Sequence, residues 1–305
     1  MIQEMRLFVG ILLTAAAAFG QAVPLIFDTD MGNDIDDALA LAVIHALESR
    51  GEAKLLAVTV TKDNPYAPVY CDLVNTFYKR GSIPVGMVNK GVTPKDANMI
   101  KVPAERKDAS GAYVYPRGLK SAKDAPDAVE LLRKVLAAQA DGSVVMVQVG
   151  FSTNLARLLE KDRELVAKKV RLLSTMAGQF PTGKPEYNVK TDLAAAKKLF
   201  SEWPTPIVAS GFEIGEAIKY PAVSIEKDFR YVKWHPVADA YRNYMKMPYD
   251  RQTWDLTSVL YAVRPDRGYF SLSTPGRIEV DGEGKTKLVP VASGQHRYLT
   301  VNEMQ

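Results

Sequence analysis

Cysteine is almost absent from this sequence, because Cys71 is the only one in 305 residues. An intrachain disulfide is therefore excluded, and the fold has to be stabilised by its hydrophobic core. Cys71 lies in an apolar pattern with Val69, Leu73 and Phe77. That pattern predicts a buried core side chain rather than a nucleophile.

Blocks of basic residues are absent as well. The chain has 39 Lys and Arg residues against 35 Asp and Glu residues, which gives a formal net charge of +4. A charge this small, spread over the whole length, does not favour binding to nucleic acid.

The N-terminal apolar run, residues 7–18, is short for a membrane-spanning helix. Arg6 precedes it, and small residues follow, with residues 18–20 and 20–22 as candidate cleavage sites. This pattern predicts a signal peptide over residues 1–22, and an exported mature chain that is periplasmic or secreted and not stably inserted in a membrane. An uncleaved anchor and a buried N-terminal helix are the alternatives.

The whole chain is 47% hydrophobic and 24% charged. The part after residue 22 has no internal repeats and no convincing linker, which predicts one domain over residues 23–305. Apolar and β-branched runs predict strands at residues 24–27, 54–61, 83–88, 143–149, 170–176 and 205–210. Helices are predicted at residues 36–47, 65–80, 127–140, from 152 onward, and at 192–200, 239–247 and 256–263. This alternation predicts an α/β fold with a mostly parallel central sheet flanked by helices and a Rossmann-like core. Residues 277–280 and 285–291 predict a C-terminal β-hairpin.

Carboxylates are concentrated just after the first strand. Five of them fall within ten residues: Asp28, Asp30, Asp34, Asp36 and Asp37. They repel one another unless a cation or bound protons compensate. Without nearby His or Cys they favour a hard cation, Ca²⁺ first and Mg²⁺ second. The alternative, that Asp36 and Asp37 merely cap a helix and complement its dipole, leaves Asp28 and Asp30 unexplained.

Two other motifs do not fit this stretch. An EF-hand loop starting at Asp28 requires Gly and Glu where Asn33 and Leu39 stand. A haloacid-dehalogenase-type phosphatase also begins with Asp-x-Asp after a strand, but it continues into a Gly-Thr or Gly-Val pair. In a parallel α/β sheet, ligands bind at the carboxyl ends of the strands, which predicts that Asp30, Asn64, Val149 and the irregular loop 178–190 lie close together.

The order Asp28-Thr29-Asp30, Gly32, Asp36-Asp37-Ala38 resembles the N-terminal fingerprint of the nucleoside hydrolases, Asp-x-Asp-Pro-Gly-x-Asp-Asp-Ala. Here Met31 replaces the usual Pro, and the turn has two extra residues. Further segments are similar to that family in the same order: residues 59–64, 149–154, 186–188 and 254–256. The resemblance covers about residues 24–291 and implies a nucleoside hydrolase-like fold.

The resemblance also implies roles for single residues. Calcium would be bound by Asp30, Asp37, Asp255 and the main-chain carbonyl of Val149. Substrate would be bound by Asp36, Asn64, Glu186, Asn188 and Trp254. Calcium can take the vicinal hydroxyls of a ribose as ligands, while carboxylate and amide groups suit its hydroxyl pattern. The alternatives are structural: Asn64 as a turn residue, Glu186 and Asn188 as solvated loop residues, Asp255 as a helix cap and Trp254 as a core anchor.

The chain also departs from the inosine-uridine preferring type, which is associated with two histidines that serve the leaving base. Trp254 stands at the first of these places, as in purine-specific members, and residues 89–124 contain no histidine. His45 lies in an apolar helix and His296 in the tail, so only His235 has a loop position from which it could approach the site. Phe180 stands where the family has an Asn, which puts the usual 5′-hydroxyl contact in doubt.

The sequence therefore predicts calcium-dependent hydrolysis of the N-glycosidic bond of ribonucleosides, with purine nucleosides as the preferred class. Calcium would lower the pKa of a bound water, and Asp30 would act as the general base. The alternatives are a hydrolase of another ribosyl or pentosyl compound and a calcium-dependent ribose or nucleoside binding protein without turnover. The expected partner is a small nucleoside-like molecule, and the resemblance implies a homo-oligomer, either a dimer or a tetramer.

Overall fold

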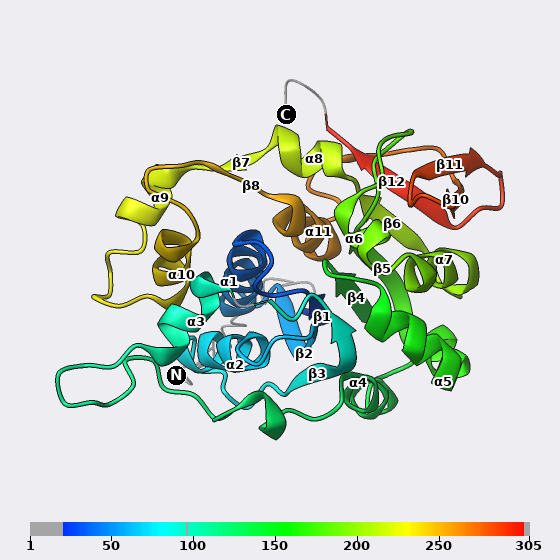
Figure 1. The fold of residues 1–305 in the computed structure, drawn as a ribbon. Helices are drawn as coiled ribbons and strands as arrows, with labels where there is room; N and C mark the ends of the chain where they lie inside the picture. Colours follow the sequence, from blue (N-terminus) through cyan, green and yellow to red (C-terminus); the bar gives the residue numbers. More distant parts are fainter. Residues whose placement is uncertain (1–20, 96, 302–305) are drawn as a thin grey trace, which may run out of the picture.

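The computed structural model describes residues 21–95 and 97–301, so that most of the expected signal peptide, residues 1–20, lies outside the described residues. A large, mostly parallel sheet runs through the centre of the molecule (Figure 1). Six of its strands are parallel and follow the order β3-β2-β1-β4-β5-β6. They span β1 (Val23–Thr29), β2 (Ala53–Lys62), β3 (Val85–Val92), β4 (Val144–Gln148), β5 (Val170–Met176) and β6 (Ile207–Ser210).

The C-terminal hairpin extends the same sheet beyond β6. It consists of β10 (Gly276–Val280) and β11 (Thr286–Pro290), which pair antiparallel. Strand β12 (His296–Thr300) lies between the hairpin and the core, parallel to β6 and antiparallel to β10. The predicted fold class and hairpin are confirmed, whereas β12 was not predicted. Two short pairings complete the strands: β9 (Ser271–Leu272) with β12, and β7 (Lys219–Tyr220) with β8 (Arg251–Gln252).

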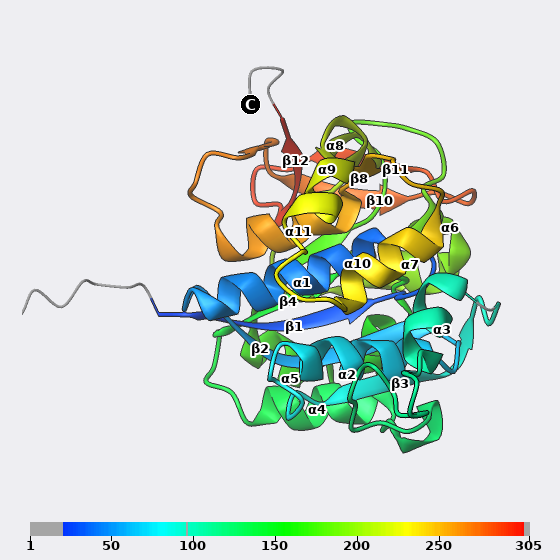
Figure 2. The same ribbon diagram turned by 90° about the vertical axis from the view of Figure 1, so that its left-hand side faces the viewer.

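Helices cover both faces of the sheet (Figures 1 and 2). One face is covered by α1 (Asp36–Ser49), α2 (Ala67–Phe77), α10 (Pro236–Tyr244) and α11 (Trp254–Val263). The other is covered by α4 (Ala128–Ala137), α5 (Thr153–Lys169) and α7 (Leu193–Glu202). The remaining helices are shorter: α3 (Asn98–Glu105), α6 (Tyr187–Thr191), α8 (Phe212–Ala217), α9 (Ala222–Lys227) and the 3₁₀ turn Ala122–Asp124.

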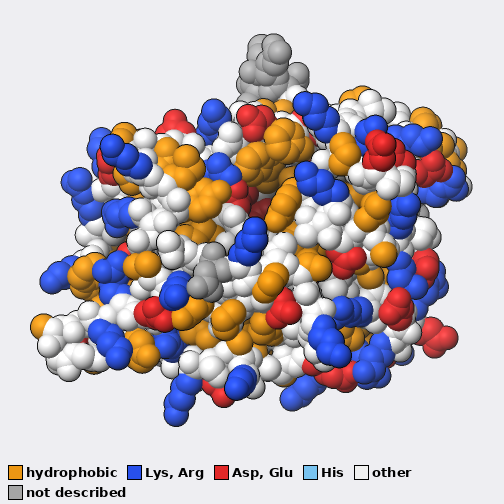
Figure 3. All heavy atoms as spheres, viewed as in Figure 1, with side chains coloured by type: hydrophobic (Ala, Val, Ile, Leu, Met, Phe, Trp, Pro, Cys, Tyr) orange, Lys and Arg blue, Asp and Glu red, His pale blue; other side chains and the backbone are white. Residues whose placement is uncertain are grey.

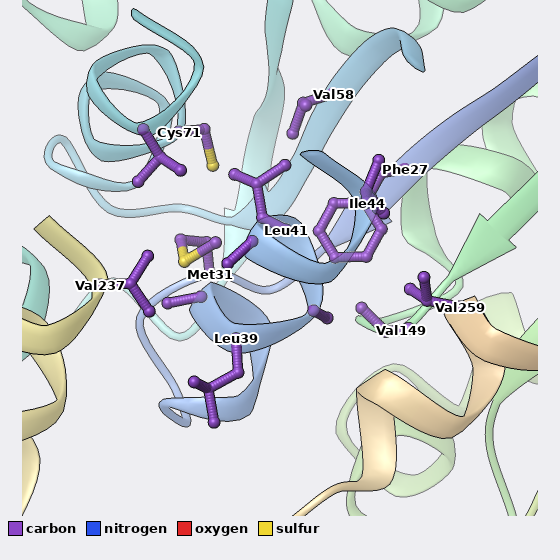
Figure 4. Packing of buried hydrophobic residues seen from close by; sticks show 14 of the residues in the cluster. Phe27, Met31, Leu39, Leu41, Ile44, Val58, Cys71, Val149, Val237 and Val259 are labelled. Carbon is purple, nitrogen blue, oxygen red and sulfur yellow. The ribbon is translucent and has the colours of Figure 1, made fainter. Parts of the chain in front are cut away.

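Helix α1 is buried almost all round, because it packs against the sheet on one side and against α2, α10 and α11 on the others. Leu39, Leu41 and Ile44 of this helix lie in a cluster with Phe27 of β1 and Cys71 of α2 (Figure 4). Cys71 is fully buried, so its predicted core position is confirmed. None of the helices in the described part of the chain is long and apolar enough to cross a membrane.

The strand order places a topological switch point between β1 and β4, which are neighbours in the sheet although β2 and β3 lie between them in sequence. The main-chain N–H of Val149, just past the end of β4, donates to the carbonyl oxygen of Asp28 at 2.8 Å. In open α/β sheets, ligands bind in the crevice at this point. The loops after β1 and β4 are therefore where the chain should build its site.

The two long segments that lacked periodicity are partly helical. The segment 89–124 contains α3 and the 3₁₀ turn, and the loop 178–190 contains the start of α6. Each of these elements is short, so its sequence shows too few turns for a helical period to stand out.

Candidate active site

A cavity of about 400 Å³ opens at the carboxyl ends of β1 and β4. Figure 3 shows this side of the molecule, with acidic side chains deep in a hollow that apolar and basic side chains surround. Eight of the nine predicted site residues line it: Asp30, Asp36, Asp37, Val149, Glu186, Asn188, Trp254 and Asp255. They come from β1, α1, β4, the α6 region and α11, so segments more than 200 residues apart in sequence meet here.

Three carboxylates form the centre of the cavity wall. One oxygen from each of Asp36, Asp37 and Asp255 lies within 4.8 Å of the others, and all three side chains are buried. Asp36 and Asp37 occupy the first turn of α1, and Asp255 occupies the first turn of α11. Both helix N-termini therefore point positive dipole ends at the carboxylates, which favours their charge.

Hydrogen bonds fix two of these side chains. Thr29 Oγ1 at the end of β1 donates to Asp37 Oδ1, and the main-chain N–H of Asp255 donates to Asp36 Oδ2 at 3.1 Å. Burial, reinforced by the neighbouring carboxylates, raises the pKa of Asp36, Asp37 and Asp255 well above the ordinary range. Three clustered carboxylates that are costly to ionise alone fit a hard cation that takes oxygen ligands. The sequence predicted Asp30, Asp37 and Asp255 as the carboxylate ligands of the metal and Asp36 as a substrate contact. In the structure, the three carboxylates that lie together are those of Asp36, Asp37 and Asp255.

Asp30 lies beside this group at the end of β1, 4% exposed. Its Oδ2 accepts a hydrogen bond of 2.7 Å from Asn33 Nδ2. Burial raises the pKa of Asp30 to about 6, and the nearby Asp34 also acts in the raising direction. A carboxylate with a pKa close to neutral is suited to accept a proton in a reaction.

The loop after β5 supplies Glu186 and Asn188. Glu186 caps α6, and its carboxylate accepts hydrogen bonds from the main-chain N–H groups of Gly178, Asn188 and Val189. Burial raises its pKa to about 7 against the effect of these donors. The Asn188 side-chain amide donates to the carbonyl oxygen of Val149 at 2.8 Å. Val149, whose carbonyl oxygen is a predicted calcium ligand, thus lines the cavity with Asn188 bonded to that oxygen.

Trp254 lines the same cavity. Its indole stacks on Phe212 with ring centroids 5.4 Å apart, and its Nε1 donates to the Phe212 carbonyl oxygen at 2.9 Å. The guanidinium of Arg251 lies over the indole at 5.1 Å and forms an ion pair with Asp34. Trp254, Phe212 and Arg251 therefore give the cavity wall aromatic surface and a cation.

Asn64 is the one predicted site residue that the structure does not bring into the cavity. It is fully buried, its side-chain amide donates to the carbonyl oxygen of Lys95 at 2.9 Å, and its Oδ1 accepts from the Tyr66 main-chain N–H at 2.9 Å. These bonds hold the loops after β2 and β3 together, the structural role that an Asn before Pro65 suggests.

The histidines lie elsewhere. His235 is buried among Phe77, Tyr78, Phe229 and Tyr231, and it caps α10. His45 contacts Asn75 within the core, and His296 lies in β12. None of the three is among the residues that line the cavity.

Sequence reasoning missed several residues of the cavity wall: Asn33, Asp34, Met176, Tyr187, Phe212 and Arg251. Asn33 and Asp34 belong to the turn with two extra residues, a departure that could have pointed to them. Arg251 and Phe212 carried no such signal, because only the three-dimensional fold brings their loops over the site.

This fold and cavity define a Rossmann-like α/β protein with a carboxylate-rich site at the switch point of its sheet. The sequence profile of the inosine-uridine preferring nucleoside hydrolases matches residues 25–301. The chain therefore belongs to the inosine-uridine preferring nucleoside hydrolase family. It is a glycosyl hydrolase whose substrate is a small nucleoside.

Solved structures share the fold at low sequence identity. A plant nucleoside hydrolase is 22% identical with a TM-score of 0.69, and the match covers 92% of this chain and 95% of that one. A purine-preferring ribonucleoside hydrolase from Gardnerella vaginalis is 20% identical with a TM-score of 0.68, covering 92% and 94%. The type III effector protein XopQ, complexed with adenosine diphosphate ribose, is 17% identical with a TM-score of 0.68, covering 91% and 88%. No curated protein sequence matches the chain.

Proposed function

We propose that this enzyme is a calcium-dependent nucleoside hydrolase that prefers purine ribonucleosides and releases ribose and the free base. The observation that carries the proposal is the meeting of Asp30 with the carboxylates of Asp36, Asp37 and Asp255 in one cavity. A general base and a hard-cation site are then adjacent. Glu186 and Asn188 line the same cavity and offer groups that match sugar hydroxyls.

The ion would be held by Asp36, Asp37 and Asp255, together with Asp30 and the Val149 carbonyl. When bound, calcium would bind the ribose hydroxyls and make a water molecule more acidic. In the reaction, Asp30 accepts a proton from water, the water oxygen bonds to C1′, and the bond from C1′ to the base breaks. The departing base takes a proton from solvent, since the described residues of the cavity wall include no histidine.

Purine preference is proposed from the aromatic residues of the cavity wall. Trp254 and Phe212 line the cavity with aromatic side chains, and a purine has the larger ring system for stacking on them. The structural similarity to a purine-preferring ribonucleoside hydrolase from Gardnerella vaginalis is consistent with this assignment. Calcium is proposed over magnesium because its larger, more flexible coordination sphere accommodates several carboxylates and two sugar hydroxyls.

A second candidate substrate is another ribosyl compound. The fold is shared by XopQ, which was solved with adenosine diphosphate ribose, and Arg251 adds a cation to the cavity wall. An anionic group attached to the ribose or to the leaving group could pair with this guanidinium.

The test is a panel of purine and pyrimidine nucleosides and adenosine diphosphate ribose, assayed for release of base or ribose. Each assay is run with the purified protein before chelation, after exhaustive chelation, and after addition of calcium or magnesium. We expect purine nucleosides to react fastest, activity to disappear on chelation and calcium to restore it. Full activity after chelation would contradict the metal mechanism, and turnover of adenosine diphosphate ribose alone would favour the second candidate.

We also propose that the mature chain is exported, because residues 1–22 have the pattern of a signal peptide. N-terminal sequencing of the protein from a cell fraction would place the start of the mature chain. Light scattering on the same sample would test the expected dimer or tetramer.

A further inference from the structure

Lys62 lies at the end of β2 and is almost completely buried, with 2% of its surface exposed. Its Nζ donates to Asn33 Oδ1 and to the main-chain carbonyl oxygen of Thr93, each at 2.7 Å. Both acceptors are neutral oxygens. The positive charge of the buried Lys62 is therefore compensated only by carboxylates that it does not contact directly. The negative charges of Asp30 and Asp37 oppose the fall in the Lys62 pKa that burial causes.

Asn33 connects this ammonium group to Asp30. Its Oδ1 accepts from Lys62, and its Nδ2 donates to Asp30 Oδ2 at 2.7 Å. An ammonium group can only donate hydrogen bonds, so the amide oxygen must face Lys62 and the amide NH₂ group must face Asp30. Thr93 Oγ1 lies 3.5 Å from the same nitrogen, too far to orient the amide alone.

The hydrogen bonds from Lys62 Nζ reach Asp30 through this amide, and the positive charge of Lys62 also acts on Asp30 through space, in the direction that lowers the Asp30 pKa. Asn33 lines the main cavity, whereas Lys62 lines a second cavity of about 330 Å³ that Asn33 also borders. A substrate in the main cavity would therefore touch Asp30 and Asn33 but not Lys62.

We propose that Lys62 and Asn33 are positioning residues that hold the Asp30 carboxylate in its reactive orientation. Asn33 occupies Oδ2 of Asp30, so the other carboxylate oxygen, Oδ1, is the one that accepts the proton from water. Lys62 prevents the Asn33 side-chain amide from flipping. A flipped amide would place its oxygen against the Asp30 carboxylate. Asn33 belongs to the turn after β1, which is two residues longer than in the family fingerprint, so this arrangement uses a turn in which the chain departs from that fingerprint.

This inference rests on the proposed role of Asp30 as the general base. Its test is a double-mutant cycle in the full-length mature enzyme with a purine nucleoside, using Lys62→Met, Asn33→Ala and the double variant. Lys62→Met keeps the length of the side chain and removes the donor. We expect each single variant to lose about tenfold or more in kcat, the scale of a hydrogen bond to a charged group, with little change in KM.

If Lys62 acts through Asn33, substituting Lys62 removes no further orienting hydrogen bond once Asn33 is alanine. The double variant should then have a kcat within about twofold of that of Asn33→Ala, because only the through-space effect of the Lys62 charge on Asp30 is still lost. Additive losses would overturn the proposal, and so would a rise in KM with kcat unchanged, because that pattern belongs to a residue that binds substrate.

The matched control is Lys95→Met. Lys95 is an exposed lysine that lines the same second cavity, so its removal tests loss of positive charge in general. We expect its kcat to stay within about twofold of the parent. An equal loss in Lys95→Met and Lys62→Met would contradict a specific role for Lys62.

Folding is separated from positioning by a second variant and a melting curve. Lys62→Gln retains an N–H donor without the charge, and it should recover part of the kcat that Lys62→Met loses at an equal melting temperature. If the loss of kcat in Lys62→Gln and Lys62→Met only follows the decrease in the fraction of folded protein, the role of Lys62 is structural and the proposal fails. The proposed function fails separately, if the parent enzyme releases no base or if Asp30→Asn keeps its turnover.

Discussion

The main-chain N–H of Asp255 donates to the carboxylate of Asp36 at 3.1 Å, which joins the first turn of α11 to the first turn of α1 across 219 residues of sequence. The bond uses the backbone of Asp255, so the Asp255 carboxylate itself is free to face Asp37 and the cavity. Two helix N-termini thus deliver their carboxylates to one point, which is what a hard-cation site requires.

Asp255→Asn should therefore have opposite effects with and without calcium. The backbone bond to Asp36 survives the substitution, while one of the mutually repelling carboxylates is lost. Without metal, we expect the melting temperature to rise, because a buried charge is removed. Calcium affinity should fall by at least about tenfold, the scale of losses around metal sites. Calorimetric titration and melting curves measure both, and unchanged calcium affinity would exclude Asp255 as a ligand.

Asp30→Asn tests the general base. We expect the fold to be retained and turnover to fall by at least roughly a hundredfold, the usual scale for loss of such a group. Asp141→Asn is the control, since Asp141 is an exposed carboxylate that pairs with Lys169 away from the cavity. Near-normal turnover in Asp30→Asn would place the base at another residue.

The stability of the metal-free protein should fall as pH rises from 5 to 7.5, which is opposite to the usual behaviour of carboxylates in folded proteins. Burial raises the pKa of Asp30 to about 6 and that of Glu186 to about 7, above the range of an unfolded chain. Folding therefore favours their protonated forms, and the stability they contribute is present at low pH and is lost as pH rises toward about 7. We expect chelated protein to melt at a lower temperature at pH 7.5 than at pH 5.

Calcium should reverse that trend, because its ligands bind as carboxylates and no longer need protons. The contribution of Glu52, whose pKa the hydrogen-bonded Arg264 lowers to about 2, is constant in this pH window. Burial lowers the pKa of His235 and His296 to about 4, so these two residues oppose the trend, but the buried carboxylates with a raised pKa outnumber them. Melting curves at several pH values with chelator and with calcium measure the effect. A chelated protein that becomes more stable between pH 5 and pH 7.5 would contradict it.

Local sequence patterns predicted the parts of the site that depend on residues close together in the sequence. The apolar run ending at residue 176 predicted β5, and the carboxylates before an apolar segment predicted the start of α1. Arg251 and Lys62 could not be predicted in the same way, because their roles depend on segments that are distant in sequence. For Asn64 the sequence predicted a site role that the structure does not show. The residue type matches the family motif, but the side chain joins the loops after β2 and β3.

Gly150 is the residue that allows the segment after β4 to lie close to the end of β1. A Cβ atom at this position would lie 2.5 Å from the main-chain nitrogen of Asp30 and 2.4 Å from Thr61 Oγ1. We expect Gly150→Ala to cost about 1–3 kcal/mol of folding stability, the usual range for overpacking, and to lower turnover by displacing Asp30. Gly282→Ala, where a Cβ meets nothing within 4 Å, is the control for denaturant unfolding and activity. Equal stability of the two variants would show that the close approach relaxes without cost.

Trp254 is predicted to help the base leave by stacking. Its indole lines the cavity beside Asp255, and an indole face attracts a ring that is gaining positive charge. Phe212 stacks on the indole and the Arg251 guanidinium lies over it at 5.1 Å, so a stacked purine would take the place of this guanidinium. This attraction is about 0.5–2 kcal/mol, so Trp254→Ala should slow purine nucleosides by up to about thirtyfold. p-Nitrophenyl riboside, whose leaving group needs no proton, should be affected much less. Trp254→Phe keeps an aromatic face and should retain part of the purine activity.

The competing explanation is that Trp254 only packs, since its ring stacks on Phe212 and its Nε1 is bonded to the Phe212 carbonyl oxygen. Packing loss would displace the whole cavity wall and slow both substrates equally. Trp234→Ala serves as the control, because Trp234 is 44% exposed and is not among the residues that line the cavity. The ratio of kcat/KM for the purine nucleoside to that for the nitrophenyl riboside decides the matter. A ratio unchanged by Trp254→Ala would leave packing as the explanation, because only stacking on the departing base distinguishes the two substrates.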